Sequence, residues 1–137
     1  MPDSFNHFDK IAEAMDTALQ QIPRKGAFDI IADYAAHAAR DTGFMANSGY
    51  VVTADSSTYG KAGEPTKEGA YLLPQVASPD DKYTAIAAIG ANYAEMVELG
   101  TVHMAAQPAF YPAVDRAKPG IEAAVAAVKD AMEKAAS

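Results

Sequence analysis

Residues 91–112, with the sequence ANYAEMVELGTVHMAAQPAFYP, decide how the chain is organised, because they join a short helix to the last long one. Tyr93, Met96 and Val97 are apolar residues at helical spacing, which predicts a helical turn around them. Gly100 is expected to end that turn, since glycine adopts positive φ without steric penalty. Pro108 then predicts the first turn of a terminal helix, where proline is well tolerated.

Residues 101–107 show neither helical nor strand periodicity, although most of them are apolar. His103 is the only titratable residue among them. An apolar, irregular segment beside a helix start is typical of a contact surface. The contact is either with the chain's own domain or with another chain.

Several short motifs lie in order along this part of the chain. They are Tyr93-Ala94, Val97-Glu98-Leu99-Gly100-Thr101, Met104-Ala105-Ala106-Gln107-Pro108 and Pro112-Ala113. Together they resemble the signature of a family of small phage proteins, described as tail-component or tail-completion proteins of long-tailed phages. A second matching patch lies at Asp41-Thr42-Gly43 and Asn47-Ser48, and the resemblance spans residues 28–134 in order.

The resemblance implies a structural virion protein of the neck, where head and tail join, in a tailed phage or a gene transfer agent. It implies a homo-oligomeric ring, expected to be a hexamer, that bridges the head connector and the tail tube. The partners would be head-closure or connector proteins on one side and tail terminator or tail tube proteins on the other. The ring would assemble in the host cytoplasm, and DNA would pass through its lumen without sequence-specific binding.

A ring of identical subunits requires one patch of each subunit to meet a different patch of the next. The segment from Gly100 to Phe110 offers apolar side chains for one patch, and the polar loop 55–69 offers an arm that orders on assembly. The candidate interface residues are Tyr59, Glu98, Thr101, Val102, His103, Met104, Gln107 and Phe110. Glu98 is also expected to fix the following loop by accepting hydrogen bonds from backbone N–H groups.

The chain has 137 residues and is expected to form a single domain, with a helical part at 1–43, a sheet at 44–90 and a C-terminal part at 91–137. Its formal net charge of −7 argues against a surface that follows nucleic-acid phosphates. The absence of cysteine excludes disulfides and thiolate metal sites. The N-terminus lacks the pattern of a signal peptide, and no apolar run approaches the length of a membrane span.

Apolar residues at helical spacing predict a first helix at 4–22 and a second at 24–40. Pro23 is expected to stop the first helix, because its ring clashes with the preceding turn. The alternative is one long, kinked helix. The terminal helix is expected to start near Pro108 and to break or kink at Pro119-Gly120.

Three strands are predicted, at 48–54, 70–77 and 82–90, and the first of these stretches is rich in β-branched and aromatic residues. Residues 55–69 form a long polar loop between the first two. Pro74 places the second strand at an edge or a bulge, and this strand is expected to form a hairpin with the third. The expected fold is α+β, with N-terminal helices and a kinked C-terminal helix packed on a small antiparallel sheet.

The sequence offers no constellation for catalysis, and we expect no enzyme activity, cofactor or metal. His7, His37 and His103 lack a second ligand at metal-binding spacing. Glu95 and Glu98 are three residues apart and are interpreted as a solvated face rather than an acid–base pair. The alternative to a virion protein is a small α+β adaptor that binds a partner, or a ligand-binding domain, outside a virion.

Overall fold

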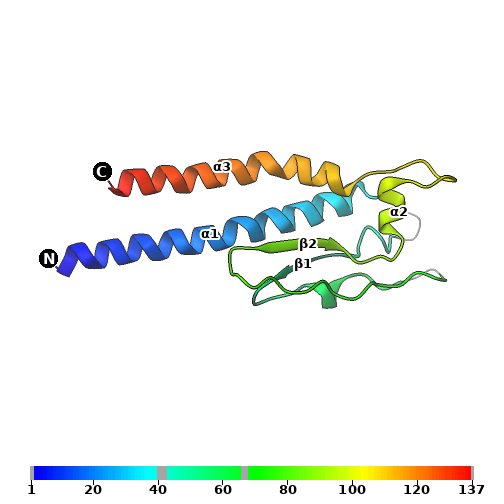
Figure 1. Cartoon of the computed structure of the whole chain (residues 1–137), viewed down its shortest axis with the longest axis horizontal. Coiled ribbons are helices and arrows are strands. Elements are labelled where there is room, and N and C mark those ends of the chain that lie inside the picture. Colours follow the sequence, from blue (N-terminus) through cyan, green and yellow to red (C-terminus); the bar gives the residue numbers. More distant parts are fainter. Residues whose placement is uncertain (1, 40–42, 66–67, 137) are drawn as a thin grey trace.

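The computed structural model describes residues 2–39, 43–65 and 68–136, and among them the side chains from residue 9 to residue 135. In chain order the elements are α1 (Pro2–His37), β1 (Gly49–Thr53), a 3-10 turn η1 (Tyr59–Lys61), β2 (Ala85–Ile89), α2 (Ala94–Leu99) and α3 (Phe110–Ala136). The two long helices lie side by side, and the sheet packs under the C-terminal half of α1 (Figure 1). The fold is α+β, as predicted. The predicted turn at Asp41-Thr42 and the side chain of His7 lie outside the described part.

The N-terminal part is one helix, so the predicted stop at Pro23 is wrong and the alternative of a single long helix is confirmed. Proline in a helix interior costs about 3 kcal/mol. Packing along the helix opposes that cost, because Gly26 and Ala27, just beyond Pro23, are buried. Gly26 lies so close to Ile121 of α3 that an added Cβ would be 2.7 Å from its Cδ1 atom. Contact with α3 thus stabilises α1 around Pro23, where the local sequence predicts that the helix ends.

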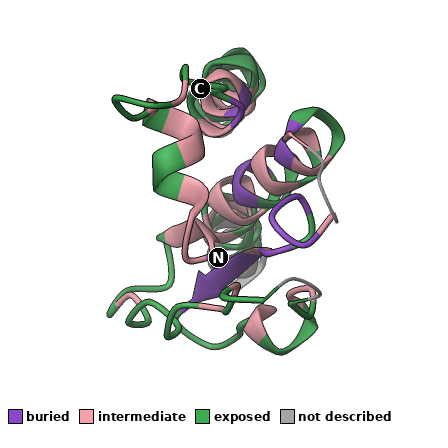
Figure 2. Cartoon of the chain, turned by 90° about the vertical axis from the view of Figure 1, so that its right-hand side faces the viewer, coloured by how far each residue is buried: buried purple, intermediate pink, exposed green. Residues whose placement is uncertain are grey.

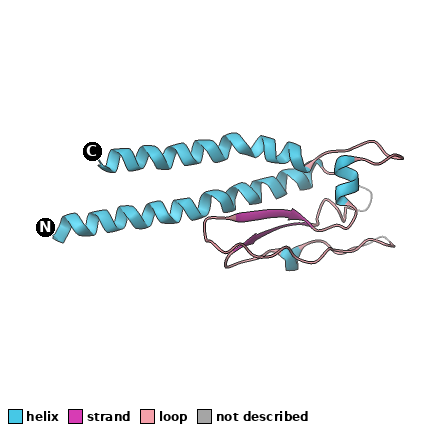
Figure 3. Ribbon diagram, viewed as in Figure 1, coloured by secondary structure: helices cyan, strands magenta, loops and turns pink. Residues whose placement is uncertain are grey.

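The sheet has two antiparallel strands, and its register pairs Gly49 with Ile89 and Thr53 with Ala85 (Figure 3). The predicted second strand at 70–77 is wrong, because this segment makes only an isolated bridge between Leu72 and Ala91. Pro74 has no N–H to continue the ladder. The predicted hairpin with the third strand is therefore wrong as well, and β2 pairs with β1 instead.

The core lies where the C-terminal end of α1 meets the N-terminal end of α3. Its buried members are Tyr34, Ala38, Phe44, Met45, Ala46, Ala91, Ala109 and Ala113. Figure 2 shows buried residues around the facing ends of the helices and, in addition to this cluster, along β1. Phe110 packs edge-on against Tyr34, with 6.2 Å between ring centroids. The core thereby anchors the first turn of α3, next to the segment that the sequence singles out.

The last helix is continuous from Phe110 to Ala136, so of the two outcomes expected at Pro119-Gly120, a break or a kink, the break is excluded. Polar side chains hold it to α1, since Arg116 Nε donates to Asp33 Oδ2 at 2.8 Å. The turn before β2 is tied to α1 in a similar way, with Lys82 Nζ 3.1 Å from Asp16 Oδ2. Both long helices extend past the end of the sheet, and the two termini lie at the same end (Figure 1).

Candidate functional site

The end of the molecule opposite the termini contains α2, the loop 100–109 and the first turn of α3, and part of the polar loop 55–69 also reaches it (Figure 1). Gly100 ends α2 with φ of 80°, as predicted, and its N–H donates to the carbonyl oxygen of Met96 at 2.8 Å. A Cβ at Gly100 would lie 2.7 Å from the backbone nitrogen of Ala106. The position therefore requires glycine both for its backbone angle and for the close approach of the returning chain.

The loop that follows is closed by its own backbone. Thr101 N–H donates to Met104 O at 2.8 Å, and Met104 N–H donates back to Thr101 O at 3.3 Å. Gln107 N–H then donates to Val97 O at 2.8 Å, which ties the second half of the loop to α2. The loop is a defined turn although the sequence shows no periodicity there.

Val102 stands at the apex of this turn and is 95% exposed. Three other large apolar side chains in this part of the chain are at least half exposed: Met96, Leu99 and Tyr111. We call these four residues the tip surface. An isolated exposed apolar residue is ordinary, whereas several of them on one projecting end are typical of an interaction site.

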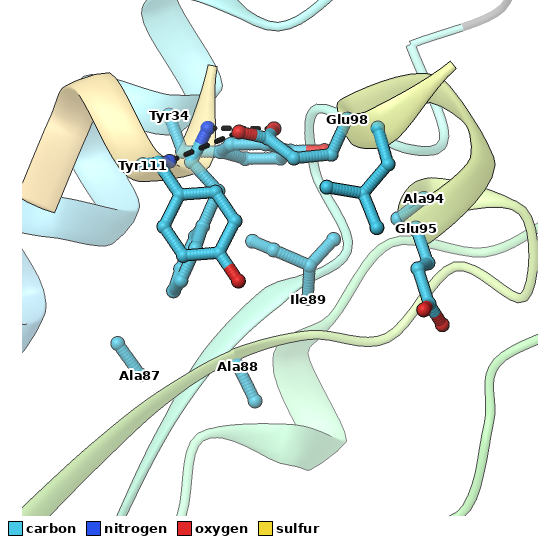
Figure 4. Close-up of a pocket in the computed structure, with 10 residues that line it drawn as sticks. Tyr34, Ala87, Ala88, Ile89, Ala94, Glu95, Glu98 and Tyr111 are labelled. Atoms are coloured by element: carbon cyan, nitrogen blue, oxygen red, sulfur yellow. Dashed lines mark hydrogen bonds between the residues drawn. The ribbon is translucent and has the colours of Figure 1, made fainter. Parts of the chain in front are cut away.

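Glu98 accepts hydrogen bonds from backbone N–H groups, as predicted, but these lie at the start of α3 and not in the loop that directly follows Glu98. Its Oε1 accepts from the N–H groups of Ala109 and Phe110, both at 2.9 Å, and its Oε2 accepts from Tyr111 N–H at 3.0 Å (Figure 4). Burial alone would raise the pKa of this carboxyl, but the three backbone donors outweigh burial and lower it. Glu98 thus caps the N-terminus of α3 from a neighbouring helix, where a negative charge is favourable.

Two hollows flank α2. One, of about 290 Å³, lies between β2 and the start of α3 and is lined by Tyr34, Ile89, Leu99 and Tyr111 among others (Figure 4). The second, of about 480 Å³, lies under the closed turn and is lined mainly by apolar residues such as Met45 and Met104. The second hollow suits an apolar side chain of a partner rather than a charged ligand, whereas the first is also lined by the carboxylates of Glu95 and Glu98.

The structure brings most of the predicted interface residues together on or beside the tip. Thr101, Val102, His103 and Gln107 are exposed, and Met104 is partly buried in the second hollow. Phe110 is partly buried against Tyr34. The contribution of these residues to an interface stays a prediction.

Tyr59 lies apart from the tip, on the far side of β1. Its hydroxyl donates to Leu73 O at 2.7 Å, and its ring centroid is 4.9 Å from that of Tyr50. The start of the loop 55–69 is also held to the sheet, since Thr58 N–H donates to Val51 O at 3.0 Å. The first part of this loop therefore has partners inside the chain, which differs from the freely ordering arm predicted from its composition.

Sequence reasoning placed Met96 on the apolar stripe of a helix and did not single out Leu99 or Tyr111. The helix α2 has only six residues, so it buries part of one face and leaves the others exposed. The short distance in sequence between Tyr93 and Gly100 could have predicted that this helix leaves apolar side chains exposed.

Among the described residues, no group of three or more His, Asp or Glu side chains is placed to hold a metal ion. None of the helices in the described part of the chain combines the length and apolarity of a membrane span. Comparisons with protein families, with curated proteins and with solved structures gave no match.

Proposed function

We propose that this chain is a structural subunit of the head–tail neck of a tailed phage or a related particle. Copies of it would form a ring that bridges the head connector and the tail tube. The ordered motifs between residues 93 and 113, which resemble the signature of tail-completion proteins, support this proposal. The same residues build the tip surface and the two hollows beside it.

The exposure of Val102 is the observation that supports the proposal most directly. An apolar side chain that is 95% exposed has no role in the stability of the isolated chain. The backbone nevertheless holds it in place, through the closed turn between Thr101 and Met104 and the anchorage of Gln107 on α2. A rigid turn that presents an apolar knob is suited to inserting into a hollow on a partner, because little entropy is lost on binding.

Charge is compatible with a ring around DNA. The formal net charge is −7, and a negative wall lets a phosphate backbone pass without the counterion release that drives adhesion. The segment 99–114 contains no Asp, Glu, Lys or Arg. The proposed contact region is therefore the part of this acidic chain where copies repel each other least.

The test is to replace Val102 by Asp in the strain that produces the particles and to image them by electron microscopy. We expect separate heads and tails, because a carboxylate at the apex cannot enter an apolar hollow without a large desolvation cost. Val125→Asp is the matched control, since Val125 is half exposed on the outer part of α3, away from the tip. We expect joined particles from the control.

Two results would overturn the proposal. One is the absence of this chain from purified tailed particles, measured by mass spectrometry. The other is a Val102→Asp variant that folds, as shown by circular dichroism, and still gives fully joined particles.

A further inference from the structure

One edge of the sheet has backbone groups without a partner. Gly90 N–H donates to Ser48 O at 2.9 Å, which places a hydrogen-bonded pair directly before the pair of Gly49 with Ile89. Hydrogen-bonded and non-hydrogen-bonded pairs alternate along an antiparallel ladder. The N–H and C=O groups of Ile89 therefore point away from β1.

The outer side of β1 confirms this alternation. Val51, which faces Ala87 in the register, donates its N–H to Thr58 Oγ1 at 2.9 Å and accepts from Thr58 N–H at 3.0 Å. Both bonds lie on the side of β1 away from β2. By the same alternation, the groups of Ala87 point outward on the other side of the sheet, as do those of Ala85 and Ile89. In the part of the chain that the structure describes, these outward groups accept and donate no hydrogen bond.

The edge is also unprotected. Natural sheets block free edges with proline, lysine, bulges or covering loops. The strand β2 reads AIAAI, it is paired without a bulge, and each of its residues is partly exposed. The hollow lined by Ala87, Ala88 and Ile89, and on its far side by Glu95 and Glu98, opens beside it and leaves room for side chains of an approaching strand.

The distribution of charge along the chain indicates which kind of partner can approach the edge of β2. Residues 83–94, which contain β2 and both of its flanks, have no Asp, Glu, Lys or Arg. Two copies of a chain with net charge −7 repel each other, so they are expected to meet along an uncharged strip. The small side chain of alanine at the middle of the strand permits close approach of a second backbone.

We infer that the outer edge of β2 pairs with the β2 edge of a second copy of this chain, antiparallel about a two-fold axis at Ala87. In that register Ala85 faces Ile89 of the other copy, and Ala87 faces its own symmetry mate. Each outward N–H then meets an outward C=O, so all of these groups are satisfied at once. No other symmetric register satisfies all of them. The product is a continuous four-stranded sheet across two chains.

This pairing is an isologous contact, whereas a ring requires heterologous contacts. It uses the sheet edge, and the hollow beside that edge is also lined by Leu99 and Tyr111 of the tip surface. The pairing of the β2 edges is tested by its own experiments, whatever their outcome for the proposed neck function. A ladder of five residues buries little area, and the dimer is therefore weak and dependent on protein concentration.

Amide hydrogen exchange tests the inference without any substitution. In dilute protein the outward amides of Ala85, Ala87 and Ile89 exchange fast, while the inward amides of Ile86 and Ala88 are protected. In concentrated protein the outward amides become protected by at least tenfold, and the inward amides serve as internal controls. Outward amides that are already protected in the monomer, or that stay unprotected at the highest soluble concentration, would each overturn the inference.

Cysteine substitutions test the register. The chain has no cysteine, so an introduced thiol is unique. Facing residues of a hydrogen-bonded pair have Cα atoms about 5.5 Å apart, within disulfide range. An Ala87→Cys variant forms a disulfide dimer under mild oxidation. An Ala85→Cys variant does not, because its symmetry mate lies about 13 Å away along the strand. Equal cross-linking of both variants, or none of Ala87→Cys, would reject the two-fold at Ala87.

Discussion

Glu98 shows how one side chain sets the geometry of the candidate site. Its carboxylate binds three successive backbone N–H groups at the start of α3, so the direction of that helix depends on a residue in α2. Backbone hydrogen bonds to Glu98 were predicted, because a carboxylate directly before an irregular segment can accept from backbone N–H groups. Which N–H groups it binds was not predictable, since they lie 11 to 13 residues further along the chain.

Replacing Glu98 by Gln should lower the free energy of unfolding at pH 7 by about 1 kcal/mol, the usual contribution of a helix cap. The pKa of Glu98 is lowered in the folded state relative to its ordinary value of 4.5. Its stabilisation is therefore fully present above pH 4.5 and is lost as the pH falls through the folded-state pKa. Urea unfolding of both proteins at several pH values should show their difference shrinking in acid.

The control for this change is Glu95→Gln, on the same short helix. Glu95 is exposed and has no hydrogen bond within the described part of the chain. The Glu95→Gln variant should therefore have nearly the same free energy of unfolding as the unsubstituted protein at each pH. Equal losses from the two variants would show that the charge of α2, and not the cap, is responsible.

Gly100 and Gly69 permit a second comparison between single residues. Both have positive φ, of 80° and 82°, so alanine is strained at either position. A Cβ at Gly69 meets nothing within 4 Å, whereas one at Gly100 overlaps the backbone of Ala106. Gly69→Ala should cost about 1 kcal/mol, and Gly100→Ala should cost clearly more. Thermal unfolding of the two variants measures the difference, and equal costs would contradict the close approach in the loop.

Among the helices and strands that form, the short ones lie where the local sequence predicts them, whereas the long helices extend past their predicted ends. The strand Gly49–Thr53 and the helix Ala94–Leu99 form where the β-branched residues and the glycine stop predict them. The helices α1 and α3 continue through Pro23 and Pro119, because packing of one helix on the other offsets a local defect. The segment 70–77 has strand composition, but Pro74 and the pairing of β2 with β1 leave it outside the sheet. The strand propensity of each segment alone could not reveal that β2, and not residues 70–77, would pair with β1.

The continuity of α3 gives a prediction at this scale. Gly120 lies in the middle of the helix, is exposed, and an added Cβ would meet nothing within 4 Å. Gly120→Ala should therefore raise the free energy of unfolding by about 0.5–1 kcal/mol, the difference in helix propensity. Chemical denaturation measures it. A loss of stability would mean that α3 bends at this residue in solution and needs the freedom of glycine there.

At the scale of the whole molecule, charge and contact surfaces are segregated. The acidic residues give the chain a net charge of −7, while the segments 83–94 and 99–114 contain no Asp, Glu, Lys or Arg. One of these holds the β2 edge and the other most of the tip surface. Composition alone predicted an acidic protein, but the sequence did not reveal that parts of both uncharged segments would lie at the surface of the folded chain. Their exposure depends on the sheet having two strands and on α2 being short.

This segregation determines how salt should act on self-association. Two copies with the same net charge repel each other, and contacts along uncharged strips contain no ion pair for salt to weaken. Raising NaCl from about 0.05 M to about 0.5 M shortens the Debye length to a few ångströms and screens the repulsion. Sedimentation equilibrium should therefore show tighter self-association at the higher salt concentration. Weaker association in salt would mean that ion pairs hold the copies together, and it would move the contact from these strips to the charged faces of α1 and α3.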